Sequence, residues 1–250
     1  MNTHNLPKFL TALPVYNEVR HLEPVLDRVR QFSPEILVVN DGSKDGTAEL
    51  LVGQSGIHVV THPTNQGYGA ALRSAFQFAL SLDYDVLVTI DCDGQHEPER
   101  IPELVAAMFP PSGDIIDIVS GSRYLQQFEG DSRPPEARRR INQIITQEIN
   151  ERLSLTLTDA FCGFKAYRVP ALRHLDISDL GYAMPLQVWV QSVAHGWKIV
   201  EFPVPLIYLD ETRSFGGSLD NADLRLAHYR AAFEHEMLRW FPCGEPALSR

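Results

Sequence analysis

Short apolar runs alternate along the chain with longer segments in which apolar side chains recur every third or fourth position. The short runs predict strands at Phe9–Leu13, Ile36–Val39, Ile57–Val60, Val86–Ile90 and Ile115–Ser120. The longer segments predict helices over Val19–Gln31, from about Thr47, over Ala70–Leu82 and around Ile101–Met108. Strands that alternate with helices build a parallel sheet, so the first half predicts an α/β fold. Val86–Ile90 is apolar almost throughout, which is typical of a central strand covered on both faces.

The second half is less regular. It begins with a charged segment at Phe128–Arg140 and a helix that we expect to end at Leu153. The remaining elements are a segment at Gly163–Tyr167, a helix near Leu186–His195, a strand at Ile199–Val204 and a terminal helix around Leu224–Trp240. The sequence has no internal repeat and no evident linker, so we expect residues 1–250 to form a single domain.

Composition narrows the class of protein. The 250 residues carry a formal net charge of −10, which opposes broad binding to nucleic acid because phosphates require a basic surface. The three cysteines lack a metal-ligand spacing, and we interpret them as reduced thiols. No stretch approaches the ~20 apolar residues that span a bilayer, and the N-terminus has no signal pattern. We therefore expect a cytoplasmic protein.

The clearest chemical signal follows the predicted central strand. Asp91 and Asp93 come directly after it, and strand alternation would place both carboxylates on one side. Ligands of open α/β sheets bind beyond the carboxyl ends of the strands, where this pair falls. Two carboxylates favour a hard cation such as Mg²⁺ or Mn²⁺, which links protein oxygens to substrate phosphates, and Gln95 could add an oxygen. The alternative is a solvated turn that the two aspartates form with Gly94.

Two further polar segments are expected at the same edge of the sheet. Leu13–Glu18 lies at the end of the first strand, and Val38–Thr47 lies at the end of the second. Tyr16 offers an aromatic face, Asp41 could accept a hydrogen bond from a base, and Glu18 could reach a base or a ribose. The alternative for the second segment is helix capping by Ser43, Asp45 and Thr47.

Several segments together resemble a known family. They are Pro14–Glu18, Asp41–Thr47, Asn65–Arg73, Asp91–His96, Gly121–Tyr124 and Asp159–Arg168. Their order and spacing resemble family 2 glycosyltransferases, most of all the branch that includes dolichyl-phosphate mannosyltransferase and bacterial polyprenyl-phosphate glycosyltransferases. The resemblance spans roughly Leu10 to Ser218. It departs from the family at Leu219, where lysine is common, and at Phe128–Arg140, which lacks the usual tryptophan.

The resemblance implies the GT-A fold, a mostly parallel central sheet with helices on both faces. It implies a nucleotide-sugar-binding half at 1–120 and an acceptor-binding half at 121–250. It also implies an inverting transfer from a UDP- or GDP-sugar to a polyprenyl phosphate, with Mg²⁺ or Mn²⁺. The residues implied for the nucleotide-sugar are Pro14, Tyr16, Glu18, Val39, Asp41, Asp91 and Arg213. Those implied for the metal are Asp91, Asp93 and Gln95. Those implied for the acceptor phosphate are Arg123, Arg213 and one of Arg138, Arg139 and Arg140, of which we take Arg139.

The same resemblance assigns catalysis to Asp93, Arg123 and Asp159. An ionised polyprenyl phosphate needs positioning by cations more than it needs a base, whereas a hydroxyl acceptor needs a carboxylate base. Asp159 is the candidate for that base or for orienting the acceptor, unless it caps a turn or pairs with an arginine. We expect His96 to orient a carboxylate of the metal site rather than bind the metal.

Three alternatives stay open. The acceptor could be a soluble hydroxyl compound, or the chain could be a catalytically inactive module that binds a nucleotide-sugar. A nucleotidyltransferase would need a Gly-rich basic loop where this chain has Pro14–Glu18. Peripheral membrane contact through Phe128–Arg140 or the terminal helix also stays open, although an apolar stripe on that helix is typical of a core helix as well.

Overall fold

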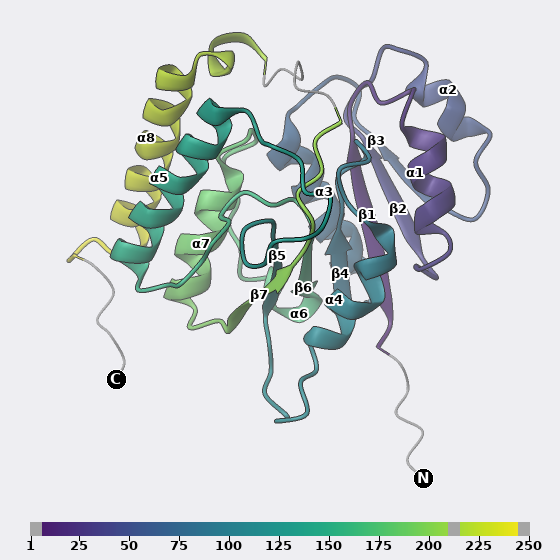
Figure 1. Cartoon of the computed structure of the whole chain (residues 1–250). Coiled ribbons are helices and arrows are strands. Elements are labelled where there is room, and N and C mark those ends of the chain that lie inside the picture. The colour runs from purple at the N-terminus through teal and green to yellow at the C-terminus, as the bar shows by residue number, and fades with distance from the viewer. Residues whose placement is uncertain (1–6, 210–215, 245–250) are drawn as a thin grey trace.

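The computed structural model describes residues 7–209 and 216–244, and its centre is one seven-stranded sheet (Figure 1). The strands lie in the order β3-β2-β1-β4-β6-β5-β7. Their bounds are β1 (Phe9–Val15), β2 (Ile36–Asn40), β3 (His58–Thr61), β4 (Val86–Thr89), β5 (Ile118–Ser122), β6 (Lys165–Arg168) and β7 (Ile199–Pro203). Every strand predicted from the apolar runs is present, with small differences at the ends.

Within the described residues, eight helices and two short 3₁₀ turns accompany the strands. The helices are α1 (Leu22–Val29), α2 (Thr47–Val52), α3 (Tyr68–Ser81), α4 (Ile101–Ala107), α5 (Glu136–Leu153), α6 (Val169–Leu172), α7 (Met184–Ala194) and α8 (Ala222–Trp240). The 3₁₀ turns are η1 (Pro98–Arg100) and η2 (Gly217–Asp220). None of these described helices combines the length and apolar character that a bilayer crossing requires.

The sheet is mostly parallel, as the sequence predicts. Strands β1, β2, β3 and β4 pair in parallel, and so do β5 and β7. The exception is β6, which lies between β4 and β5 and runs antiparallel to both. The boundary expected at residue 120 falls inside β5, so strands from both parts of the chain share this sheet.

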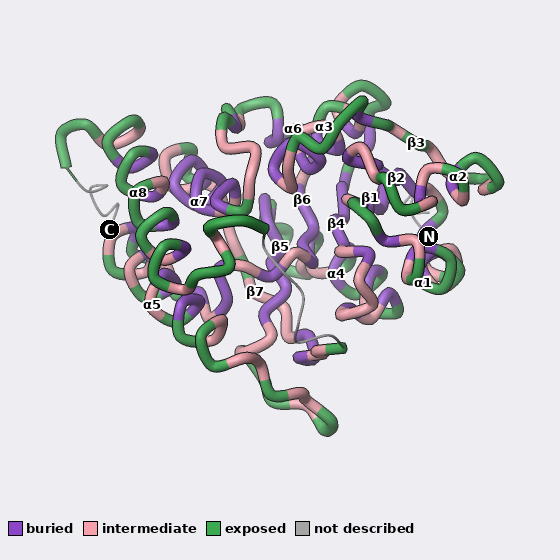
Figure 2. The backbone as a smooth tube through the Cα atoms, turned by 90° about the horizontal axis from the view of Figure 1, so that it is seen from above, coloured by how far each residue is buried: buried purple, intermediate pink, exposed green. Residues whose placement is uncertain are grey.

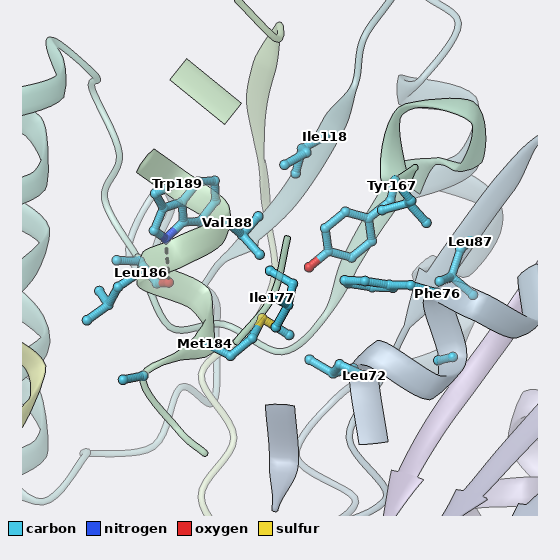
Figure 3. Close-up of a cluster of buried hydrophobic side chains, with 14 of the residues drawn as sticks. Leu72, Phe76, Leu87, Ile118, Tyr167, Ile177, Met184, Leu186, Val188 and Trp189 are labelled. Carbon is cyan, nitrogen blue, oxygen red and sulfur yellow. Dashed lines mark hydrogen bonds between the residues drawn. The ribbon is translucent and has the colours of Figure 1, made fainter. Parts of the chain in front are cut away.

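Helices cover both faces of the sheet, which confirms the predicted architecture. Alternate side chains of β1 divide between two apolar clusters: Leu10 and Ala12 pack with α3, α5, α7 and α8, whereas Leu13 and Val15 pack with α1 and α4. Leu87 of β4 joins the first cluster and Val88 the second, so β4 is buried on both faces as expected. Figure 2 shows these strands buried in the middle of the molecule, and Figure 3 shows part of the first cluster.

Helix α1 begins at Leu22, later than the expected start at Val19. The backbone N–H groups of Glu18 and Val19 donate to the side chains of Thr47 and Asp45, at 3.1 and 3.0 Å. Asn17 has a left-handed φ of 56°, a conformation that asparagine tolerates better than most residues. These long-range bonds hold an extended turn after β1, and the helix starts only after it.

Candidate active site

A cavity of about 870 Å³ lies where β1, β2, β4 and β5 end. Eight of the residues predicted for the site line it together: Pro14, Tyr16, Glu18, Asp41, Asp91, Asp93, Gln95 and Arg123. They come from four separate segments of the sequence, and the parallel strands bring these segments to one edge of the sheet. The predicted clustering of the polar segments is therefore confirmed.

The carboxylate of Asp91 is held by two aromatic residues. Tyr68 donates its hydroxyl proton to Asp91 Oδ1 at 3.1 Å, and His96 Nε2 lies 3.6 Å from Oδ2. Gly163 packs against the same carboxylate, because a Cβ at that position would lie 2.2 Å from Asp91 Oδ2. Burial and the charge of Asp91 raise the pKa of Tyr68 well above its usual value, so Tyr68 stays a proton donor. The expected contact between His96 and a carboxylate is present.

Asp93 and Gln95 form the second part of this motif. Asp93 Oδ1 accepts a hydrogen bond of 3.0 Å from the backbone N–H of Gln95, which fixes the turn. Within the described residues, no group of three or more His, Cys, Asp or Glu side chains is arranged to hold a metal ion by itself. A pair of carboxylates with an amide oxygen instead suits Mg²⁺ or Mn²⁺, which complete their shells with substrate phosphates and water. The donor set therefore fits such an ion bound together with a diphosphate.

The loop after β2 is hydrogen-bonded to the turn after β1. Ser43 Oγ accepts from the backbone N–H of Asn17 at 2.9 Å, and Asn17 Oδ1 accepts from the backbone N–H of Lys44 at 2.8 Å. The N-cap of α2 is Gly46, which makes no side-chain cap hydrogen bond, although Asp45 accepts from the N–H of Thr47. Capping therefore explains only part of this motif, and the main role of its polar side chains is to shape the turn that carries Tyr16 and Glu18.

Asp41 is buried and supports the loop before α3. Its Oδ1 accepts from the N–H of Gln66 at 2.9 Å and lies 2.6 Å from His62 Nδ1. Its Oδ2 accepts from the N–H of Gly67 at 2.8 Å. Gly67 has a φ of 106°, and a Cβ there would lie 2.3 Å from the carbonyl oxygen of Leu180. A hydrogen bond from a nucleobase to Asp41 would therefore share a carboxylate oxygen that already accepts a hydrogen bond from the protein.

Arg123 and Asp159 form a buried two-point pair. Arg123 Nε and Nη2 donate to Asp159 Oδ2 and Oδ1 at 2.6 and 3.0 Å, and Asn142 donates to Oδ1 at 2.7 Å. Burial alone would raise the pKa of Asp159, but the charge and hydrogen bonds of Arg123 outweigh it and lower the pKa well below its usual value. The same pairing raises the pKa of Arg123 against the effect of burial. Both groups are therefore ionised.

The structure corrects three of the predicted site residues. Asp159 is fully buried behind Arg123 and does not line the cavity, so pairing with an arginine, the alternative to a base, is confirmed. Val39 packs in the core beneath α3 and does not line the cavity. Arg138 lines the cavity, whereas Arg139 lies over the ring of Tyr124 at 3.4 Å. Arg213 lies outside the described residues.

Several lining residues were not among the predicted ones. Tyr68 belongs to the quoted segment Asn65–Arg73, and its place at the start of a helix beside the metal motif could have identified it. Lys165 belongs to the quoted segment Asp159–Arg168, whereas Asn142 carries no local signal, because its position depends on how α5 packs. Apolar and aromatic side chains from α5, α7 and α8 and from the segment before β6 also line the cavity, namely Ile141, Phe161, Met184, Val188 and Tyr229.

Comparison with known families decides the identity. A model of the family described as glycosyl transferase family 2 matches residues 11–176. The chain belongs to glycosyl transferase family 2. It is 32% identical over 243 residues to the undecaprenyl-phosphate mannosyltransferase of Micrococcus luteus, covering 93% of this chain and 98% of that protein. It is 30% identical over 235 residues to the polyprenol monophosphomannose synthase of Mycolicibacterium smegmatis, covering 89% and 85%.

Solved structures agree with this family 2 membership at the level of the fold. Glucosyl-3-phosphoglycerate synthase from Mycobacterium tuberculosis, solved with Mn²⁺, UDP and phosphoglyceric acid, matches with a TM-score of 0.69. The match covers 97% of this chain and 80% of that one, at 20% sequence identity. The chain described here therefore has the GT-A fold, and it is a glycosyltransferase.

Proposed function

We propose that this glycosyltransferase moves a sugar from a UDP- or GDP-sugar to a polyprenyl phosphate with inversion at the anomeric carbon, using Mg²⁺ or Mn²⁺. The observation that carries the proposal is the cavity that joins Asp91, Asp93 and Gln95 to Arg123 and Arg138. Oxygen ligands suited to a metal diphosphate and guanidinium groups suited to a second phosphate thus line the same space. The names of the two relatives, undecaprenyl-phosphate mannosyltransferase and polyprenol monophosphomannose synthase, support this acceptor class.

The donor would occupy the part of the cavity next to β1, β2 and β4. Tyr16, Glu18 and Asp41 would face the nucleoside, and Asp91, Asp93 and Gln95 would hold the metal and the diphosphate. The ion would neutralise charge on the departing nucleoside diphosphate. Tyr68, through its hydrogen bond to Asp91 Oδ1, would keep that carboxylate in one orientation.

The acceptor would occupy the part of the cavity next to α5, α7 and α8. The acceptor phosphate would bind Arg123, whose Nη1 remains after Nε and Nη2 bond Asp159, and Arg138 would face it from α5. An ionised phosphate attacks without losing a proton, so Asp159 would act by positioning Arg123 rather than as a base. The apolar side chains of Ile141, Met184 and Val188 would accommodate isoprene units.

We also propose that residues 1–250 work as one unit. One part of the cavity binds the donor, and the other part binds the acceptor. Because a polyprenyl phosphate resides in a membrane, the protein would act as a peripheral protein at the cytoplasmic face. Leu209 supports this contact, since it lines the cavity and is 63% exposed. Leu125, in the loop after β5, is 45% exposed. Exposed leucines suit a membrane interface.

The donor part of the proposal is tested by binding and hydrolysis of a panel of UDP- and GDP-sugars, with Mn²⁺, with Mg²⁺ and with a chelator. We expect one nucleotide-sugar to bind only with metal, and Asp93→Ala to abolish that binding. Asp27→Ala is the matched control, because the Asp27 side chain is 73% exposed on α1 and outside the cavity. If the wild type binds no donor, the proposal is wrong, and if it binds a donor but moves no sugar, the protein is an inactive module that binds a nucleotide-sugar. If sugar moves to a soluble hydroxyl acceptor instead, the acceptor assignment is wrong.

A further inference from the structure

Lys165, at the start of β6, is a buried cation in the floor of the cavity. The residue is 3% exposed and lines the cavity together with Tyr167, which is two positions further along the strand. Alternate residues of a strand share a face, and Tyr167 belongs to the apolar cluster between the sheet and α7. Lys165 Nζ lies 5.1 Å from the ring centroid of Trp189 in the same cluster. In the view of Figure 3, Trp189 and Val188 lie on one side of Ile177, and Tyr167 lies on the other.

The hydrogen bonds of this ammonium group are incomplete. A lysine ammonium has three N–H donors, but within the described chain Nζ donates only to the carbonyl oxygen of Cys162. The carboxylate of Asp159 is engaged by Arg123 and Asn142, and the carboxylate of Glu201 accepts from the Thr158 side chain and from backbone N–H groups. Buried charged donors without partners are costly and uncommon in native proteins. The remaining donors of Lys165 are therefore available to a ligand in the cavity.

The sheet places Lys165 between the two strands that lead to the reacting groups. In the strand register, Lys165 lies opposite Thr89 of β4 on one side and Ser120 of β5 on the other. Asp91 follows Thr89 by two residues, and Arg123 follows Ser120 by three residues. A sugar that passes from a diphosphate held at Asp91 to a phosphate held at Arg123 must cross the space between them. Lys165 forms the floor of that space.

We propose that Lys165 donates a hydrogen bond to a hydroxyl of the sugar that is transferred, and so helps to select the donor by its sugar; this deepens, and rests on, the proposed glycosyl transfer. A neutral hydroxyl suits the site better than a phosphate. The carboxylates of Asp159 and Glu201 already offset the positive charge of Lys165. Burial also lowers the pKa of Lys165, which weakens its hold on a permanent positive charge.

The test compares the affinities of the intact wild type and Lys165→Met for a nucleotide-sugar and for its nucleoside diphosphate, with Mn²⁺. The probes are UDP-glucose with UDP and GDP-mannose with GDP, and the pair that the wild type binds is used. We expect Lys165→Met to bind the nucleotide-sugar at least about 10-fold more weakly and the nucleoside diphosphate within about two-fold of wild type. Lys198→Met is the control, because Lys198 is exposed and pairs with Asp114 on the surface.

Deoxy-sugar donors make the test specific to the hydroxyl. One deoxy donor should bind the wild type about 10-fold more weakly than the complete donor, and Lys165→Met should bind both equally. An equal loss for the nucleoside diphosphate, or a change only in the acceptor KM, would show that Lys165 is structural or belongs to the acceptor site. If Lys165→Met does not fold, Lys165→Gln replaces the ammonium with a shorter, neutral amide, and a ranking of the deoxy donors that stays as in the wild type would overturn the inference. A wild type that binds no nucleotide-sugar overturns the proposed function as well.

Discussion

Replacing Asp159 with asparagine removes the charge opposite Arg123 and keeps the shape of the side chain. The pair has two hydrogen bonds, of 2.6 and 3.0 Å, and the Asp159 side chain is fully buried while that of Arg123 is 16% exposed. Removing one partner of such a pair leaves a buried charge without compensation. We therefore expect Asp159→Asn to lower the free energy of unfolding by about 3–5 kcal/mol at pH 7, measured by urea denaturation.

The pH dependence follows from the lowered pKa of Asp159. The folded-state pKa lies below the unfolded value near 4, so the stabilisation by ionised Asp159 is complete above about pH 4. It is lost progressively as the pH falls from there through the folded-state pKa. The difference in unfolding free energy between the wild type and Asp159→Asn should therefore narrow below about pH 4. A urea midpoint that is the same for both proteins at pH 7 would refute the reasoning.

Activity distinguishes positioning from base catalysis in the same variants. If Asp159 acts only through Arg123, then adding Asp159→Asn to Arg123→Met should lower kcat/KM no further than Arg123→Met alone. The larger part of the effect should appear in the KM for the acceptor, because Arg123 is expected to hold its phosphate. Independent, multiplicative losses in the double variant would instead show that Asp159 has a chemical role of its own.

Three other substitutions follow from single contacts. Tyr68→Phe removes the hydrogen bond to Asp91 and should raise the Mn²⁺ concentration for half-maximal donor binding about 10-fold without unfolding the protein; an unchanged Mn²⁺ titration would contradict this. Gly163→Ala pushes a methyl group into Asp91 and should abolish metal-dependent donor binding, whereas Gly181→Ala, with only an ordinary contact at 3.5 Å, should bind normally. Glu236→Leu leaves the buried donors of Gln187 and Gln191 and the half-buried donor of Trp240 without this acceptor. It should cost about 3–5 kcal/mol of unfolding free energy, against under about 1 kcal/mol for the exposed control Glu234→Gln.

The donor edge of the site could be predicted because its signals are local. Apolar runs mark the strands, and polar residues directly after them must meet at one edge of a parallel sheet. The sequence alone therefore predicted that Asp91 and Asp93 lie close to Tyr16 and Asp41, and all four line the cavity. The start of α1 has no such local signal, because it depends on hydrogen bonds that the distant side chains of Asp45 and Thr47 accept.

The acceptor side could not be predicted in the same way. Strand β6 has only four residues and inserts antiparallel between β4 and β5, so its place depends on non-local pairing. The choice between Arg138 and Arg139 depends on the phase of α5. The buried residues Ile141, Asn142 and Ile145 fix that phase, and helical spacing from the first two puts Arg138 on their side. This periodicity was present in the sequence and would have corrected the assignment.

The most direct test of the central claim is transfer of labelled sugar from the bound nucleotide-sugar to a short polyprenyl phosphate, compared with the matching polyprenol. The account predicts product with the phosphate in the presence of Mn²⁺, no product with the alcohol, and no product with chelator or with Asp93→Ala. Transfer to the alcohol at the same rate as to the phosphate, or transfer that persists with chelator, would contradict it.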